Sequence, residues 1–332
     1  MLSFKAFLRI LINSLVGVVL VLIWLKFVNL SELLKVLKTT DLKYIFGVLA
    51  FFAISSVLRS IRLKILLNSI SIPLKNLIFL SFLSQLLSFI IPLRVGEISK
   101  SVYLSTQYSL PLTKSVIWIL LDRFLDFWGN LMLISILILF VAIKLPSNFQ
   151  LIVFLVLLIF TILTILMIKS IFLSKKILEF FSSFLFFPKL KRTFLNTTLT
   201  VIEGFEILDR HPLELLQLIL ISLLALFSDA FIWFFIFASL NINLGLAKTL
   251  LGSLISALTF LIPSAPGYIG SAEAAGLAVF GGILGLNPNL ASAVAVLNHL
   301  LTTIAILISG LASLYFLKFD LNLVFKKVFR KA

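Results

Sequence analysis

The sequence contains no cysteine, two histidines, and 13 acidic residues against 28 lysines and arginines. Without cysteine the chain has no disulfide, no thiolate metal site and no cysteine nucleophile. Two histidines are also too few for a histidine-rich metal centre, so we expect neither a metal nor a cofactor. Charged residues make up only 12% of the chain, which is far below the share in soluble proteins.

Apolar residues take the place of the missing charges. They make up 61% of the chain, and the mean hydropathy is +1.21. Several apolar runs reach the roughly 20 residues that a helix needs to cross a bilayer. Strands of a membrane barrel alternate in polarity and do not produce such runs. We therefore predict an all-α, polytopic membrane protein.

Six apolar runs are predicted to cross the membrane as full helices. They lie at about residues 10–29, 43–59, 115–143, 149–168, 213–240 and 289–316.

Two shorter runs end at a proline instead of crossing. The first, 74–91, stops at Pro92, and the second, 246–262, stops at Pro263; each is followed by a short segment that returns. Irregular backbone at membrane depth is tolerated only where protein or a water-filled cavity surrounds it. These segments are therefore predicted to form two re-entrant helix pairs.

Two connecting segments are polar. Residues 30–42 are predicted to be a loop. The basic stretch 169–210, with Pro188 near its middle, is predicted to form amphipathic helices that lie on the lipid headgroups.

The two proline turns resemble each other. Leu87–Glu97 reads LSFIIPLRVGE, and Leu258–Glu273 reads LTFLIPSAPGYIGSAE. An offset of about 176 residues then aligns Glu97 with Glu273 and the pair Asp122-Arg123 with Asn298-His299. Chance accounts easily for apolar matches in this chain, but less easily for prolines and charges in register. We therefore predict a duplicated unit.

The predicted organisation has four parts. They are a first helix and loop (1–40), a first repeat (41–145), a fourth helix with a basic linker (146–211), and a second repeat with a basic tail (212–332).

Most of the 28 basic residues fall on the side of the membrane that carries both termini. The positive-inside rule makes that side cytoplasmic, so we expect a multi-pass plasma membrane protein with both termini inside. The same topology makes the two repeats inverted, an arrangement typical of transporters. Because the basic residues are not gathered on a soluble module, we expect the bilayer, and not nucleic acid, as their partner.

Three charged residues, Asp122, Arg123 and Asp126, interrupt the predicted helix 115–143 near the midplane. Each costs about 2.5–3.5 kcal/mol at the centre of a membrane helix, so such groups usually face a cavity and mark function. Arg123 and Asp126 stand three residues apart and are predicted to pair. The alternative is a buried ion pair that only holds helices together.

Further candidates lie beside the proline turns and at comparable depth in the last helix. Arg94 and Glu97 follow Pro92, where a helix beginning near Gly96 offers free amide hydrogens to a phosphate. In the second repeat the candidates are Gly267, Gly270, Glu273 and His299. Arg59 and Arg62 are predicted to end the second helix as snorkelling anchors or clamps for lipid phosphate. The alternative for Arg94 and Glu97 is a surface loop with an incidental ion pair. For the second-repeat glycines it is a structural turn, and for Arg59 and Arg62 it is plain anchoring in the membrane.

Four motifs carry a family resemblance: Arg59-x-x-Arg62, Pro92-x-Arg94-x-Gly96-Glu97, Asp122-Arg123-Phe124-Leu125-Asp126 and Pro266-Gly267-x-x-Gly270-x-x-Glu273. Together they resemble the membrane domain of the lysylphosphatidylglycerol synthase/flippase family, which includes the N-terminal half of the multiple peptide resistance factor. The resemblance implies a flippase-like domain whose re-entrant pairs frame a headgroup cavity. Tyr268 and His299 depart from the glycine and arginine usual there.

The resemblance favours a flippase for an anionic phospholipid or a polyprenyl-linked intermediate, working by alternating access. The chain ends at Ala332 without a soluble aminoacyl-transferase domain, so we expect no synthase activity. The alternatives are a membrane-embedded enzyme that modifies lipid headgroups and a helper subunit of one. A separate synthase or glycosyltransferase and a second copy of the chain are possible partners.

Overall fold

The computed structural model consists of helices and their connections. It describes residues 4–67, 71–91, 95–143, 146–169, 171–185, 187–209, 212–259 and 265–320, and these ranges contain no strand. The all-α class is confirmed. In chain order the elements are α1 (Phe4–Phe27), α2 (Leu30–Lys38), α3 (Lys43–Leu66), α4 (Leu74–Ile90), α5 (Val95–Gln107), α6 (Leu112–Phe140), α7 (Ser147–Lys169), α8 (Ile171–Ser183), α9 (Pro188–Asp209), α10 (Pro212–Ser239), α11 (Leu246–Thr259), the 3₁₀ turn η1 (Pro266–Tyr268), α12 (Ser271–Gly276), the π-helical η2 (Leu277–Ile283) and α13 (Pro288–Leu317).

Within the described residues, α3, α6, α10 and α13 are long and apolar enough to cross a membrane, and α1 with α2 makes a fifth span if the bent pair counts as one. Large apolar side chains on these helices point outward, among them Phe46, Phe140 and Ile308 at 79%, 81% and 67% exposure. Such an apolar exterior suits lipid and not water. The protein is therefore a polytopic membrane protein, while six crossings and the inverted repeat stay predictions.

The segment after α1 is a helix and not the predicted loop. Asn29 caps α2, since its side-chain oxygen accepts hydrogen bonds from the backbone amides of Ser31 and Glu32. The chain bends by 87° between α1 and α2. Asn289 at the start of α13 holds this corner by accepting from the Asn29 amide at 2.8 Å and by donating to Glu32.

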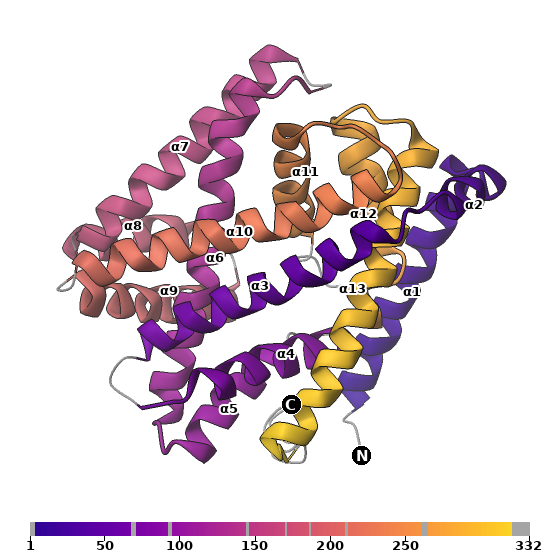
Figure 1. The fold of residues 1–332 in the computed structure, drawn as a ribbon. Coiled ribbons are helices and arrows are strands. Elements are labelled where there is room, and N and C mark those ends of the chain that lie inside the picture. The colour runs from indigo at the N-terminus through magenta and orange to yellow at the C-terminus, as the bar shows by residue number, and fades with distance from the viewer. Residues whose placement is uncertain are drawn as a thin grey trace.

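Helices α3 and α10 lie side by side and antiparallel across the middle of the molecule (Figure 1). Gly47 meets Phe235 near one end, Ser55 bonds to Asp229 farther along, and Arg62 reaches Ser222 near the other end. Helix α3 continues to Leu66, so the predicted end near residue 59 is wrong. The helix continues because Arg59 and Arg62 find buried carboxylates and do not have to reach the headgroups.

The two short apolar helices each pack against the last helix of the other predicted repeat. Helix α4 lies on α13, where Gly310 gives room to Leu86, and α11 lies on α6. The predicted repeat requires this kind of reciprocal packing. It brings the ends of α4 and α11 toward the same interior space.

Helices α7, α8 and α9 lie to one side of this arrangement and pack against one another and against α6 (Figure 1). Pro188 begins α9, where its fixed φ and missing amide hydrogen suit the first turn. Leu178 of α8 and Ile202 of α9 are buried. These helices form one wall of a large interior cavity.

Candidate functional site

The most deeply buried ion pairs join Arg62 of α3 to α6. Its Nε lies 2.7 Å from Asp122 Oδ1, its Nη1 lies 2.7 Å from Asp126 Oδ1, and Nη1 also donates to Ser222 of α10. The Arg62 and Asp122 side chains are 0% and 1% exposed. Arg62 therefore joins three helices and offers no surface to a ligand, so its predicted place as a surface anchor or phosphate clamp is wrong.

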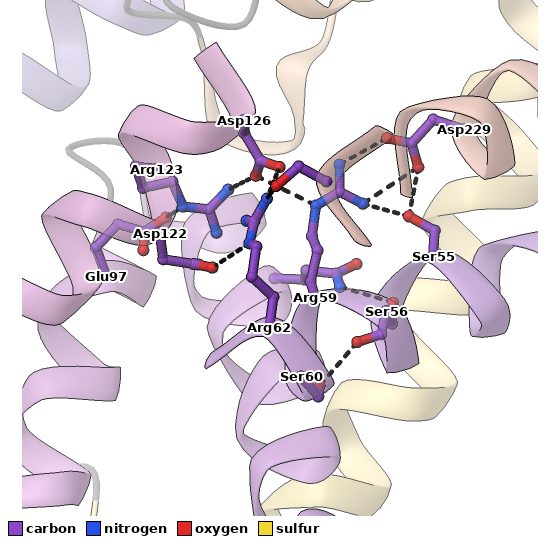
Figure 2. A network of polar contacts seen from close by, with 12 residues as sticks. Ser55, Ser56, Arg59, Ser60, Arg62, Glu97, Asp122, Arg123, Asp126 and Asp229 are labelled. Atoms are coloured by element: carbon purple, nitrogen blue, oxygen red, sulfur yellow. Dashed lines mark hydrogen bonds and ion pairs between the residues drawn. The ribbon is translucent and has the colours of Figure 1, made fainter. Parts of the chain in front are cut away.

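Arg59, one helical turn earlier, lies in the same network but faces the cavity (Figure 2). Its Nη2 and Nη1 donate to the two oxygens of Asp229 at 2.7 and 3.3 Å, and Nη1 also bonds to Ser55. Its Nε lies 3.3 Å from Asp126. A two-point contact between guanidinium and carboxylate fixes both groups more firmly than a single bond does, so Arg59 ties α3 to α10 as well as to α6.

Arg123 is the most accessible guanidinium of the network, with 38% of its side chain exposed. Its Nε lies 2.6 Å from Glu97 Oε1, and its Nη1 lies 3.5 Å from Asp126 Oδ2. The predicted pairing of Arg123 with Asp126 is confirmed. Glu97 sits in the first turn of α5, whose start at Val95 agrees with the predicted helix N-terminus near Gly96.

A lysine that the sequence analysis did not select lies behind this network. Lys100 Nζ lies 4.0 Å from Asp122 Oδ2, and its side chain is 3% exposed. It stands three residues after Glu97, on the same helical face. That spacing is the signal that identifies it from sequence.

The second repeat carries a separate polar pair in α12 and α13. His299 Nδ1 lies 2.6 Å from Glu273 Oε1, and His299 Nε2 lies 2.7 Å from the Gly267 carbonyl oxygen. The other oxygen of Glu273 accepts a 2.8 Å hydrogen bond from the Gly270 amide. Gly267 and Gly270 have φ of +69° and +80°, which a side chain disfavours. All four predicted residues thus form one cluster.

The two pairs occupy matching places in the two predicted repeats. Glu97 and Arg123 stand as far apart in sequence as Glu273 and His299, and the predicted alignment matches glutamate to glutamate and Arg123 to His299. In both, the glutamate lies in the first turn of a helix that follows the broken segment. The contact that arginine makes with Glu97 is made by histidine with Glu273.

A cavity of about 1240 Å³ lies between these groups. Its polar lining includes Arg59, Glu97, Arg123, Asp126, Asp229 and His299, and its apolar lining comes from both repeats and from α7, α8 and α9, including Phe89, Phe127, Phe160, Leu163, Phe181, Phe194, Trp233 and Ile306. It is large enough for a headgroup with part of its acyl chains.

Several buried polar atoms along this cavity have no hydrogen-bond partner among the described residues. They are Glu97 Oε2, Arg123 Nε, Asn130 Oδ1, Ser256 Oγ and Asn298 Oδ1. Arg123 Nε lies close to Glu97 Oε1 as an ion pair but without hydrogen-bond geometry. Buried polar groups normally find a partner, so the cavity is suited to a ligand or water molecules that supply hydrogen-bond donors.

The structure brings together Arg59, Glu97, Arg123 and Asp126 on one side of the cavity and His299 on the other, and it leaves Arg62 and Asp122 behind the lining. Arg94, Pro92 and Pro263 lie outside the described residues. Asp229 of α10, which is not among the predicted site residues, pairs with Arg59. Asn130, Ser256 and Asn298 are not among the predicted site residues. Their sequence signal is a polar side chain inside an apolar helix, and Asn298 also aligns with Asp122.

A family model described as the lysylphosphatidylglycerol synthase TM region matches residues 10–310. No curated protein matches the chain.

Proposed function

Because the chain belongs to the lysylphosphatidylglycerol synthase transmembrane family, we propose that it is a flippase that moves a phosphate-bearing lipid, either an anionic phospholipid or a lipid-linked intermediate, between the two leaflets. The observation that carries this proposal is the cavity. It combines a long apolar lining with a cluster of charged groups supplied by α3, α5, α6 and α10. A lipid presents the same two surfaces, an apolar chain and a polar head.

The charges suggest how a headgroup is held. Among the charged residues described on the lining, two guanidinium groups, Arg59 and Arg123, face three carboxylates, Glu97, Asp126 and Asp229. Arg123 is the more exposed guanidinium, and Glu97 is its closest partner. A phosphate enters by taking the place of Glu97 on Arg123, while hydroxyl or ammonium donors of the headgroup satisfy the free oxygens of Glu97 and Asn130.

Alternating access supplies the movement. Phe89 of α4 and Tyr268 of η1 come from different repeats, and their ring centroids lie 6.2 Å apart at the cavity wall. Rocking one repeat against the other separates such contacts and opens the cavity to one side at a time. In this proposal the protein is a transporter and not an enzyme, and it works in the plasma membrane with both termini in the cytoplasm.

The direct test is lipid movement in liposomes. The purified protein is reconstituted with a headgroup-labelled phospholipid or a labelled polyprenyl phosphate, and a membrane-impermeant quencher reports how much label stays protected over time. We expect faster exchange between leaflets than in protein-free liposomes. No acceleration with either lipid class contradicts the proposal, and chemical alteration of the headgroup instead favours an enzyme.

A partner that supplies the lipid, such as a separate synthase or glycosyltransferase, belongs to the same proposal. So does a homodimer. Both are tested by purification in a mild detergent, followed by measurement of mass and identification of copurifying chains.

A further inference from the structure

Each nitrogen of His299 faces an oxygen at hydrogen-bond distance. Nε2 lies 2.7 Å from the carbonyl oxygen of Gly267. A carbonyl oxygen only accepts hydrogen bonds, so the hydrogen of this contact is on Nε2. The tautomer of the ring is thereby assigned by its partner.

The other ring nitrogen, Nδ1, must also be compatible with the oxygen that it faces. Nδ1 lies 2.6 Å from Glu273 Oε1. If the ring is neutral with its hydrogen on Nε2 and the glutamate is ionised, two lone pairs meet at this distance. One additional proton removes the conflict, either on Nδ1 as an imidazolium facing a carboxylate or on Oε1 as a carboxylic acid facing a neutral ring. The observed contact therefore contains a bound proton.

Loss of that proton affects the turn Pro266–Gly270, which both residues contact. His299 holds the turn at Gly267, and Glu273 holds it at Gly270 by accepting the backbone amide hydrogen. When the proton leaves, Nδ1 and Oε1 repel each other and at least one side chain moves away. Tyr268, a non-glycine residue in this turn, has a positive φ, so the turn loses a support that holds an unfavourable conformation.

The matching pair in the first repeat lacks this property. Arg123 faces Glu97 at 2.6 Å, but a guanidinium group keeps its proton in proteins. The cation of that pair therefore stays charged through the pH range in which a histidine titrates. Of the two cations that contact these glutamates, the imidazole of His299 is the one that can bind and release a proton near neutral pH.

The surroundings let a proton reach the pair. His299 lines the cavity, and the side chains of His299 and Glu273 are 16% and 15% exposed. Among the described residues, the neutral Phe89 of α4 lies against the ring, and Gly17 and Val21 of α1 lie against Gly270. The cavity lining that His299 shares also includes Ser256 and Thr259 of α11 and the titratable Tyr268 of η1. The charged groups that share the cavity are Arg59, Glu97, Arg123, Asp126 and Asp229.

We propose that the Glu273–His299 pair is a proton-binding site whose occupancy changes with the orientation of the transporter, so that a proton gradient drives lipid movement. This inference rests on the proposed flippase function. The site binds a proton, and release of the proton changes the conformation of the turn Pro266–Gly270 beside the cavity. The Glu97–Arg123 pair serves as the fixed counterpart.

The first experiment detects the proton directly. The chain has two histidines, so His211→Gln leaves His299 as the single imidazole for ¹⁵N NMR in detergent or nanodiscs. Between about pH 5 and pH 9, around the usual histidine pKa of about 6.5, we expect His299 to pass from imidazolium or proton-sharing signals to neutral ones. In Glu273→Gln the amide donates to Nδ1, so the ring is expected to stay neutral. A wild-type His299 that keeps one protonation state across this range overturns the proposal.

The second experiment measures coupling in liposomes with the labelled lipids described above. A pH difference of one unit, if one proton moves with each lipid, shifts the distribution between leaflets by up to about tenfold. We expect such a shift for the wild type and no shift for His299→Arg, which can keep the ion pair with Glu273 but has no removable proton. If the labelled lipid is distributed equally between the leaflets of wild-type liposomes under the gradient, the coupling is overturned but the flippase function is not. A response to the gradient that persists in His299→Arg has the same consequence. Absence of any lipid movement overturns the flippase function and the coupling with it.

Discussion

Arg62 and Asp122 form an ion pair of 2.7 Å between Nε and Oδ1, with both side chains buried at the junction of α3 and α6. Asp122 also lies 4.0 Å from Lys100, and Arg62 also reaches Asp126 and Ser222. Charges at such depth are tolerated only when they are paired. The ion pair therefore belongs to the framework that holds Arg59 and Arg123 at the cavity.

Replacing Asp122 by asparagine is expected to destabilise the protein strongly. Arg62 then keeps its charge in a buried place with one carboxylate partner fewer, and breaking a buried pair costs about 3–5 kcal/mol. Thermal unfolding in detergent measures the loss. The matched control is Asp229→Asn, which also removes a carboxylate from an arginine of α3 but at a side chain that is 36% exposed. Equal stability losses in the two variants contradict the assigned role of Asp122.

Replacing Gly96 by alanine is expected to separate α4 from α5. A methyl group at Gly96 overlaps the Ser84 carbonyl oxygen and the Ser88 hydroxyl, and such overpacking costs about 1–3 kcal/mol. Gly282→Ala is the control, because nothing lies within 4 Å of the added carbon there. The unfolding temperature in detergent is expected to fall for the first variant and to stay or rise for the second. A Gly96→Ala protein as stable as the wild type shows that the helices are less closely packed than described.

Replacing Arg123 by alanine is expected to slow lipid movement by about tenfold or more without unfolding the protein. A hydrogen bond to a charged group contributes about 1.5–3 kcal/mol, and Arg123 is the guanidinium most open to the cavity. Lys114→Ala removes the same charge from an exposed position near the start of α6 and is expected to transport normally. Both variants are assayed in liposomes after their unfolding temperatures are compared. Normal transport by Arg123→Ala eliminates it as a headgroup contact.

Joining Phe89 to Tyr268 is expected to stop transport. The chain has no cysteine of its own, so a double variant with Phe89→Cys and Tyr268→Cys reacts with a short thiol-cleavable crosslinker only at these two sites. Their rings lie 6.2 Å apart across the two repeats. Reduction of the crosslinker is expected to restore movement, and each single-cysteine variant controls for labelling alone. Transport that continues in the joined protein contradicts alternating access at this contact.

Much of the architecture follows from patterns along the chain. Long apolar runs predict α3, α6, α10 and α13, because a bilayer demands internally bonded backbone over about 20 residues. The proline turns predict where α4 and α11 stop, although Pro92 and Pro263 lie outside the described residues. The loop predicted in place of α2 has a simple cause. This nine-residue segment with Glu32, Lys35 and Lys38 resembles a loop unless the cap at Asn29 and the packing on α13 are known.

The site was predictable in kind, but of its pairings only the local one between Arg123 and Asp126 was predicted. Charges inside apolar helices identified Arg123, Asp126 and His299, because each is costly there without a function or a partner. The same reasoning placed Arg59 and Arg62 at the surface, since basic residues at the end of an apolar run usually reach the headgroups. Their carboxylate partners lie some 60 to 170 residues away, beyond the reach of any local pattern.

By itself the sequence determined that this protein is helical and lies in a membrane, and it predicts two related proline turns with glutamates in register. Hydrophobicity and spacing are properties of neighbouring residues, so they survive without a tertiary structure. Only the tertiary structure decided that Arg62 is buried away from the cavity while Arg123 faces it. It also decided that Glu273 contacts His299 as Glu97 contacts Arg123. These distinctions depend on distances between helices that are remote in sequence, and only the tertiary packing sets those distances.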